Sequence, residues 1–274
     1  MNVIYVNHKG TQINLSQWPV MISEPETLLE AGWSYSQKGS GIVDKFFKEG
    51  KEVESIVQVF ADSKEEYTDL LNTITQVTEI DVINLKPGTL YIDDYYLQCY
   101  IVGWQYEEYE EDFYSINKRI RILAEKWIWI KETTLNFRVG SGASQGTNLD
   151  YKHDYPYDYS NGKNNQKIIN SGISSCGFEM TIYGPCTNPF ITIAGHIYSV
   201  DTSIDSGEYL KINSKTRKIY KTKVKGETVN QFSLRNREYD IFRKIPEGSS
   251  NVSWDGTFGF DITLLEERSE PKWI

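Results

Sequence analysis

Residues 90–130 read LYIDDYYLQCYIVGWQYEEYEEDFYSINKRIRILAEKWIWI, and this stretch decides the fold class. Two long runs at 90–104 and 116–130 are rich in β-branched and aromatic residues, and they flank an acidic and aromatic segment at 105–114. Such side chains favour the pleated, half-buried surface of a sheet over a helix. The pattern therefore predicts a large β-hairpin with a charged segment at its centre.

Upstream of this hairpin, the sequence predicts further strands and a single helix. Residues 3–6 and 11–15 alternate around a glycine-containing turn, which indicates a smaller hairpin, and residues 52–61 are typical of a strand. Ser63 and Glu66 have the spacing of a capping box, in which each side chain satisfies a free amide of the first helical turn. We expect a helix over residues 63–79 with one apolar stripe. The stripe consists of Tyr67, Leu70, Leu71, Ile74 and Val77.

Chain length and a change in composition predict two domains. A chain of 274 residues can support two cores of ordinary size. After residue 132 the sequence becomes rich in glycine and polar residues, at 140–146 and 161–165. Short strand-like runs at roughly ten-residue spacing then follow, as in a sandwich or jelly roll. These runs are residues 178–183, 190–193, 196–200, 209–213, 218–224, 229–234 and 258–265. We predict a mainly β protein with an N-terminal β domain over residues 1–132 and a jelly-roll sandwich over 133–274.

Composition and charge argue against several classes of protein. The net charge of -9 opposes binding to nucleic-acid phosphates, which relies on clusters of lysine and arginine. Hydrophobic residues make up 39% of the chain without the long uncharged runs of a membrane protein, so no membrane insertion is expected. Residues 1–6 lack the basic and apolar regions of a secretory leader, and we expect the protein to begin in the cytoplasm.

No motif predicts catalysis or a cofactor. The sequence contains neither a dinucleotide-binding glycine pattern nor a serine nucleophile elbow, and the histidines His8, His153 and His196 are interpreted as ordinary surface residues. The loop at 150–159 holds aspartates and His153, but their spacing fits no known metal-ligand pattern. A solvated, tyrosine-rich loop is the preferred interpretation. We therefore expect no catalytic, cofactor-binding or metal site.

The acidic and aromatic segment is the candidate contact surface. Its carboxylates favour a like-charged rim that faces a basic partner, while an ordinary solvated hairpin tip is the alternative. Tyrosines add rigid, amphipathic contact area at low entropic cost. The candidate contact residues are Tyr106, Glu107, Glu108, Tyr109, Glu110, Glu111, Asp112, Phe113 and Tyr114.

Several segments of the second half resemble the distal tail proteins (Dit) of siphophages, the long-tailed bacteriophages. They are GEYLKIN at 207–213, KIY at 218–220, FRKIPEGSSN at 242–251 and the closing stretch 258–274. The order of the expected elements is similar as well, because that family has an N-terminal β domain with one helix and a long hairpin, followed by a galectin-like jelly roll. The similarity extends over nearly the whole chain.

The resemblance implies a structural protein of the phage tail tip without enzymatic activity. It implies a homo-hexameric ring of N-terminal domains that joins the tail tube protein to the tail-tip hub protein, the tail-associated lysin, with a receptor-binding protein as a further partner. It places the protein in the virion tail tip after assembly in the cytoplasm of the host bacterium. The residues leave two alternatives open, a stand-alone carbohydrate-binding module with a jelly-roll fold and a hydrolase on a β scaffold.

Overall fold

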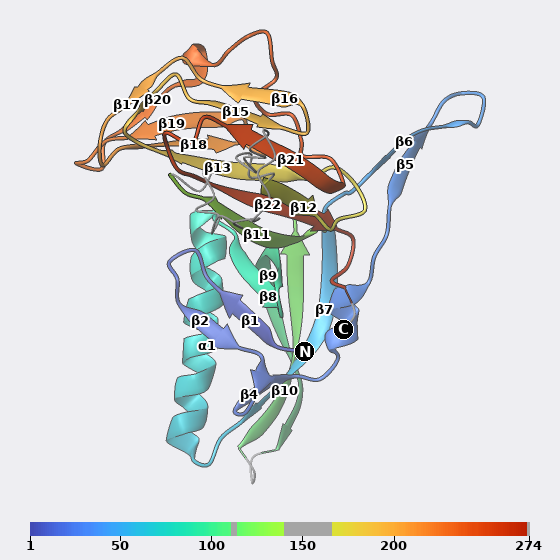
Figure 1. The fold of residues 1–274 in the computed structure, drawn as a ribbon. Helices are drawn as coiled ribbons and strands as arrows, with labels where there is room; N and C mark the ends of the chain where they lie inside the picture. The colour runs from blue at the N-terminus through green and yellow to red at the C-terminus, as the bar shows by residue number, and fades with distance from the viewer. Residues whose placement is uncertain (111–113, 140–165, 273–274) are drawn as a thin grey trace, which may run out of the picture. The chain divides into compact units, whose positions relative to one another are not determined.

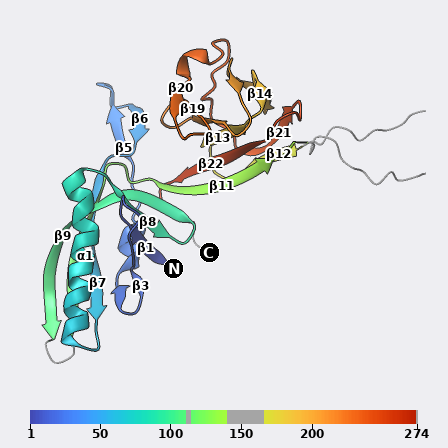
Figure 2. The ribbon, with the colours of Figure 1, turned by 90° about the vertical axis from the view of Figure 1, so that its left-hand side faces the viewer.

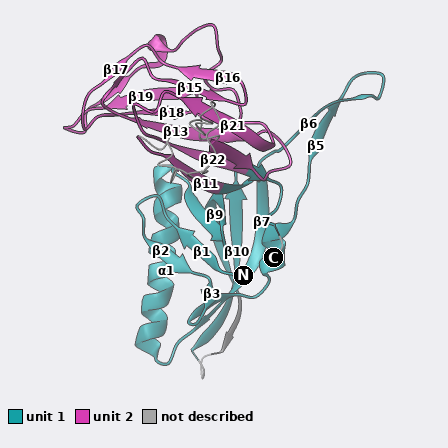
Figure 3. Ribbon diagram, in the orientation of Figure 1, with its two compact units in different colours: residues 1–131, 267–274 teal, residues 132–266 magenta. Residues whose placement is uncertain are grey.

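The computed structural model describes residues 1–110, 114–139 and 166–272. For residues 107–110 it describes only the backbone. The described chain is mainly antiparallel β structure with one α-helix, which confirms the expected fold class in outline (Figure 1). It divides into two compact units (Figure 3). Unit 1 consists of residues 1–131 with 267–274, and unit 2 of residues 132–266. The expected loops at 140–146 and 161–165 and the aspartate loop with His153 lie outside the described residues.

Unit 1 is built on an antiparallel sheet in the order β11-β9-β10-β7-β4-β3, with β1 paired to β2 and β8, and β8 paired to β9. Its strands are β1 (Val3–Val6), β2 (Gln12–Asn14), β3 (Ser16–Gln17), β4 (Val20–Ile22), β5 (Ser34–Gln37), β6 (Val43–Phe47), β7 (Lys51–Phe60), β8 (Gly88–Ile92), β9 (Tyr95–Glu110), β10 (Ser115–Ala124) and the start of β11 (Trp129–Phe137). A short 3-10 helix, η1 (Pro25–Leu29), precedes β5. The expected hairpin of β1 and β2 is confirmed, with Tyr5 opposite Ile13.

The helix α1 (Lys64–Asn84) begins where the capping box predicts. The Ser63 hydroxyl accepts a hydrogen bond from the Glu66 amide at 3.2 Å, and the Glu66 carboxylate accepts one from the Asp62 amide at 3.0 Å. The helix lies along the sheet and contacts β2, β7 and β9 (Figures 1 and 2). It runs five residues beyond the predicted end at 79, because Leu85 closes it in a left-handed conformation (φ +51°) without the glycine that usually marks such an end.

The expected large hairpin is divided into more strands than the sequence predicted. Asp93 and Asp94 form a two-residue turn between β8 and β9, with Asp93 at φ +49°. Aspartate tolerates this left-handed conformation, so the turn needs no glycine. The second arm likewise ends at Ala124, and β11 starts only at Trp129. The pairing of β9 with β10 around the acidic segment is as expected.

A buried contact between His8 and Asp81 lies inside unit 1 and corrects the interpretation of His8 as a surface residue. The His8 side chain is 13% exposed, and its Nδ1 lies 2.5 Å from the Asp81 carboxylate. Asp81 itself is fully buried on α1 and also accepts a hydrogen bond from the Tyr5 hydroxyl at 2.6 Å. These contacts join the β1–β2 hairpin to the helix.

Unit 2 contains two main sheets, in the orders β20-β19-β18-β13-β22-β11 and β12-β21-β15-β16. Its strands are the rest of β11, β12 (Gln166–Asn170), β13 (Gly177–Tyr183), β14 (Cys186–Thr187), β15 (Phe190–Ile193), β16 (His196–Ser199), β17 (Ser203–Ile204), β18 (Tyr209–Asn213), β19 (Lys218–Thr222), β20 (Thr228–Asn230), β21 (Gly248–Trp254) and β22 (Phe260–Arg268). Phe232–Leu234, expected at the end of a strand, forms the 3-10 helix η3. β12 and β21, which pair with each other, were not expected.

Each unit has its own hydrophobic core. One cluster of buried residues extends from Val3 to Trp129, and a second extends from Phe137 to Leu264 with contributions from both sheets of unit 2. Among the described helices, none has both the length and the apolar composition needed to cross a membrane.

Candidate assembly surface

The hairpin of β5 and β6 forms a two-stranded sheet of its own (Figure 1). A turn with Gly41 at φ +78° closes it, and the Lys38 amide donates to the Ile42 carbonyl at 3.0 Å. Lys38 also forms an ion pair with Asp44 at 2.9 Å. Neither strand pairs with another described strand, and the hairpin projects from the rest of unit 1 (Figure 3).

The hairpin presents large apolar side chains to solvent. Tyr35 and Phe46 lie opposite each other in the register, with their ring centroids 6.3 Å apart. They are 57% and 59% exposed, and Trp33, at the start of the hairpin, is 60% exposed. An isolated two-stranded hairpin is at best marginally stable in water, and a cluster of exposed apolar residues marks an interaction site. The hairpin, or β5–β6 arm, is therefore a candidate contact surface.

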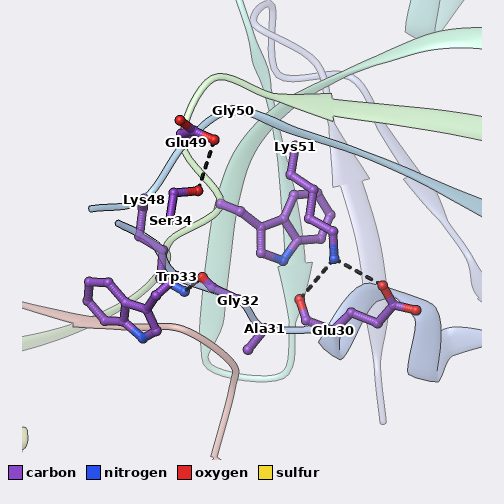
Figure 4. Close-up of a pocket in the computed structure, with 10 residues that line it drawn as sticks. Glu30, Ala31, Gly32, Trp33, Ser34, Lys48, Glu49, Gly50 and Lys51 are labelled. Carbon is purple, nitrogen blue, oxygen red and sulfur yellow. Dashed lines mark hydrogen bonds and ion pairs between the residues drawn. The ribbon is translucent and has the colours of Figure 1, made fainter. Parts of the chain in front are cut away.

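A pocket of about 510 Å³ lies at the base of this arm, between the segments 30–34 and 48–51 (Figure 4). Lys51 donates to the Glu30 carboxylate at 3.0 Å, and the Ser34 hydroxyl donates to the Glu49 carboxylate at 2.8 Å. These two bonds join the segment at the start of the hairpin to the segment after it. Gly50 fits here because any side chain would press against the carbonyl oxygen atoms of residues 124 and 125.

Aromatic and cationic groups alternate in the same pocket. Lys48 Nζ lies 4.5 Å from the ring centroid of Trp33, and Lys51 Nζ lies 5.3 Å from that of Trp127. Burial and, second, the neighbouring Lys51 cation lower the pKa of Lys48. Trp127 is buried, and its indole N–H makes no hydrogen bond within the described part of the chain. The pocket offers hydrogen-bond donors and aromatic ring faces to a ligand or partner.

The structure separates the candidate residues of the acidic segment. Tyr106 is 64% exposed on β9, with Lys118 Nζ 4.8 Å from its ring centroid. Tyr114 instead packs partly buried against the core, and its carbonyl accepts a hydrogen bond from the Ala61 amide at 3.2 Å. The backbone of Glu107, Glu108, Tyr109 and Glu110 continues β9, while Glu111, Asp112 and Phe113 lie outside the described residues.

The segment around these residues is not a free arm along its length. All ten residues of β10 pair with β7, from Ser115 opposite Phe60 to Ala124 opposite Lys51. β9 pairs with the other edge of β10. The hairpin that carries the acidic segment is therefore largely part of the sheet, and the role of its exposed residues in assembly stays a prediction.

Comparisons with known proteins bear on the fold. No protein-family model matches this chain, and no curated protein matches it. Among solved structures, the chain is similar to the Dit protein of phage SPP1, described as a paradigm of the hub adsorption apparatus in phages that infect Gram-positive bacteria. The TM-score is 0.58 and the identity 9%, and the match covers 97% of this chain and 98% of the SPP1 chain.

Two structures of the phage P2 baseplate in its activated conformation are also similar. The one with Ca has a TM-score of 0.60 at 15% identity, covering 98% of this chain and 99% of the baseplate chain. The one with Sr has a TM-score of 0.59 at 16% identity, with the same coverage. Over nearly its whole length, this chain has the fold of the SPP1 Dit protein and of a P2 baseplate chain, which confirms the expected resemblance in fold.

Proposed function

We propose that this chain is a non-enzymatic structural protein of a bacteriophage tail tip, a distal tail protein. Six copies form a ring through unit 1, and the ring joins the tail tube protein to the tail-tip hub protein, with a receptor-binding protein as a further partner. Unit 2 is a galectin-like jelly roll, with the division of the two domains near residue 132. The shared fold with a phage hub protein and a phage baseplate supports this assignment.

The observation that carries the proposal is the exposed arm of β5 and β6. A ring needs a heterologous contact, in which one patch meets a different patch on the next subunit until the rotation closes. An unpaired hairpin with Trp33, Tyr35 and Phe46 in solvent supplies one of the two patches. The acidic segment, with exposed Tyr106, is the second candidate contact and adds charge that can select a basic partner.

Light scattering of the full chain tests the proposal. Because Tyr35 and Phe46 are exposed, a Tyr35→Ser and Phe46→Ser double variant should keep the urea midpoint of the parent. We expect the parent to form hexamers as its concentration rises, and the double variant to remain monomeric. Phe190→Ser is the matched control, since this half-exposed phenylalanine lies in unit 2 and should leave the hexamer intact.

Two outcomes contradict the proposal. A parent chain that stays monomeric with the tail tube protein present and binds glycans would favour the carbohydrate-binding module. Hexamers that persist in the double variant would exclude the β5–β6 arm as the ring contact. In that case the same measurement on Tyr106→Ser shows whether the acidic segment carries the contact instead.

A further inference from the structure

Unit 2 contains a basic pocket in an otherwise acidic chain. The pocket has a volume of about 290 Å³ and is lined by Ser175, His196, Tyr198, Arg243 and Lys244, with small and apolar residues completing the wall. Among the described residues, no carboxylate lines it, although the chain has 38 acidic and 29 basic residues. The local positive charge is therefore not a consequence of an overall basic composition.

Hydrogen bonds fix the backbone that carries the two cations. The buried Tyr198 hydroxyl donates to the Arg243 carbonyl at 2.8 Å, and burial raises the pKa of Tyr198, which keeps it a donor. The Arg243 amide donates to the Asp240 carbonyl at 3.0 Å. Ile245 and Cys176 exchange two backbone hydrogen bonds of 3.0 Å each. The backbone of residues 243 and 244 is thus held on both sides, so little ordering remains for a ligand to impose.

His196 orients the guanidinium of Arg243. The Nε2 atom of His196 lies 2.8 Å from the Asp240 carbonyl oxygen, which can only accept, so Nε2 carries the hydrogen. Nδ1 then accepts from Arg243 Nη1 at 3.3 Å. This contact uses one of the five N–H groups of the guanidinium and leaves others for a ligand.

Neither cation is neutralised by a carboxylate. Within the described residues, Arg243 and Lys244 form no ion pair. The nearby Asp240 carboxylate is directed elsewhere, because it accepts from the Phe242 amide at 3.1 Å and lies 3.9 Å from Arg217. Both side chains of the basic pair are exposed and can reach a bound molecule.

A guanidinium fork beside an ammonium group and a hydroxyl suits the several acceptor oxygen atoms of a phosphate. The volume is at the lower end of that of ligand pockets, which leaves room for a phosphate and part of an attached group. We propose that this pocket binds a phosphate group, free or as part of a larger ligand, through Arg243 and Lys244. The site lies in unit 2 and does not depend on the assembly proposed for unit 1.

Titration calorimetry of the full chain with inorganic phosphate at low ionic strength tests this site. We expect binding to one site, weakened roughly tenfold or more by Arg243→Gln and by Lys244→Gln. Lys225→Gln is the matched control, an exposed lysine of the same unit outside the pocket, and should bind phosphate like the parent. Thermal melts show that each variant is folded.

Two further ligands distinguish the source of the phosphate. Glycerol 3-phosphate that binds more tightly than inorganic phosphate supports a larger phosphorylated ligand, while equal binding supports recognition of the phosphate alone. The proposal is overturned if neither phosphate compound binds, or if acetate binds more tightly than both. It is also overturned if a folded double variant, R243Q with K244Q, binds phosphate like the parent.

Discussion

At the scale of single residues, the buried carboxylate of Asp81 joins three segments of unit 1. It accepts hydrogen bonds from the Tyr5 hydroxyl at 2.6 Å and from the His8 amide at 2.9 Å, and the His8 ring lies against it. A side chain at Gly88 would overlap both Asp81 and Tyr5, so the start of β8 can approach only without one. The sequence contains each of these residues, but no local pattern indicates that they meet, because they lie far apart along the chain.

We predict that Asp81→Asn lowers the free energy of unfolding by about 1 to 3 kcal/mol. The asparagine side chain has only one acceptor oxygen atom. Its NH₂ group would therefore face the Tyr5 hydroxyl or the His8 backbone amide, each of which donates to the carboxylate in the parent chain. Urea titration measures the loss. Asp69→Asn on the exposed face of the same helix is the control and should change the midpoint little. Similar losses for the two variants would show that the buried contacts do not stabilise the fold.

The three cysteines are predicted to react slowly in the native protein. Burial raises the pKa of Cys176 and of Cys186 to about 11, and burial also raises the pKa of Cys99. The thiolate is the reactive form, and it is scarce at neutral pH for such groups. An aromatic disulfide reagent should therefore label the native chain slowly at pH ~8 and rapidly once urea unfolds it. A cysteine that reacts in the native chain at the rate of a free thiol would contradict this expectation.

At the scale of elements, α1 shows how far a local pattern extends. The capping box and the apolar stripe predict its start and its buried face, and Tyr67, Ile74 and Val77 are buried as expected. Leu71, which the stripe places at its centre, is only partly buried. The pattern predicts which face of the helix packs on the sheet. How deeply each side chain of that face is buried depends on the strands opposite it.

We therefore predict that Ile74→Ala costs about 2 to 5 kcal/mol of the free energy of unfolding, and Leu71→Ala clearly less. Ile74 is 1% exposed, so its deletion leaves a cavity, whereas the space beside Leu71 is open to water. Denaturant titration of the two variants, with equal slopes, gives the comparison. A larger loss for Leu71→Ala would mean that the helix packs on the sheet by a different face.

The β5–β6 arm illustrates what the sequence could not show. A strand is recognised when alternate residues are apolar because one face is buried. Here most residues of both strands are exposed, so no such alternation develops, and only the turn sequence around Gly39 and Gly41 hints at a hairpin. The acidic segment attracted the functional prediction because its composition is unusual. The strand that follows it, β10, pairs with β7 through long-range contacts that no local pattern encodes.

At the scale of the whole molecule, buried phenols and thiols predict loss of stability in alkali. Burial raises the pKa values of Tyr5 and Tyr198 in unit 1 and unit 2, as it does those of the cysteines. The folded chain keeps these protons, while the unfolded chain releases them above about pH 9 for cysteine and 10 for tyrosine. The contribution of these groups to the free energy of unfolding is complete below the pKa values of the unfolded chain. It is lost as the pH rises above them, by up to about 1.4 kcal/mol per group and pH unit.

Urea midpoints between roughly pH 8 and 11 test this dependence. We expect a steep fall above about pH 9, and a smaller fall in Tyr198→Phe, which has no proton to release. A Tyr209→Phe control changes a more exposed phenol, 37% exposed, and should leave the slope as in the parent. A parent chain with constant midpoints over this range would contradict the argument from burial.

The two separate cores lead to the last prediction, on the independence of the units. The cluster of unit 2 draws all its buried residues from 137–264, so no apolar contact within it requires the first unit. A domain with its own core can fold alone. We expect the fragment 132–266 to unfold cooperatively in urea as a monomer. The fragment 1–131 carries the β5–β6 arm, so any ring formation should belong to it.

Unit 1 also includes residues 267–274, which the division near residue 132 assigned to the second domain. A matched pair of fragments, 132–266 and 133–274, therefore tests where the boundary belongs. If residues after 266 belong to unit 1, the fragments 132–266 and 133–274 should have the same urea midpoint. The described residues after 266 contribute nothing to the hydrophobic cluster at 137–264, so their removal leaves that cluster intact. A non-cooperative transition in both fragments would show that the cores depend on each other. Assembly by 132–266 while 1–131 stays monomeric would place the ring contact in unit 2.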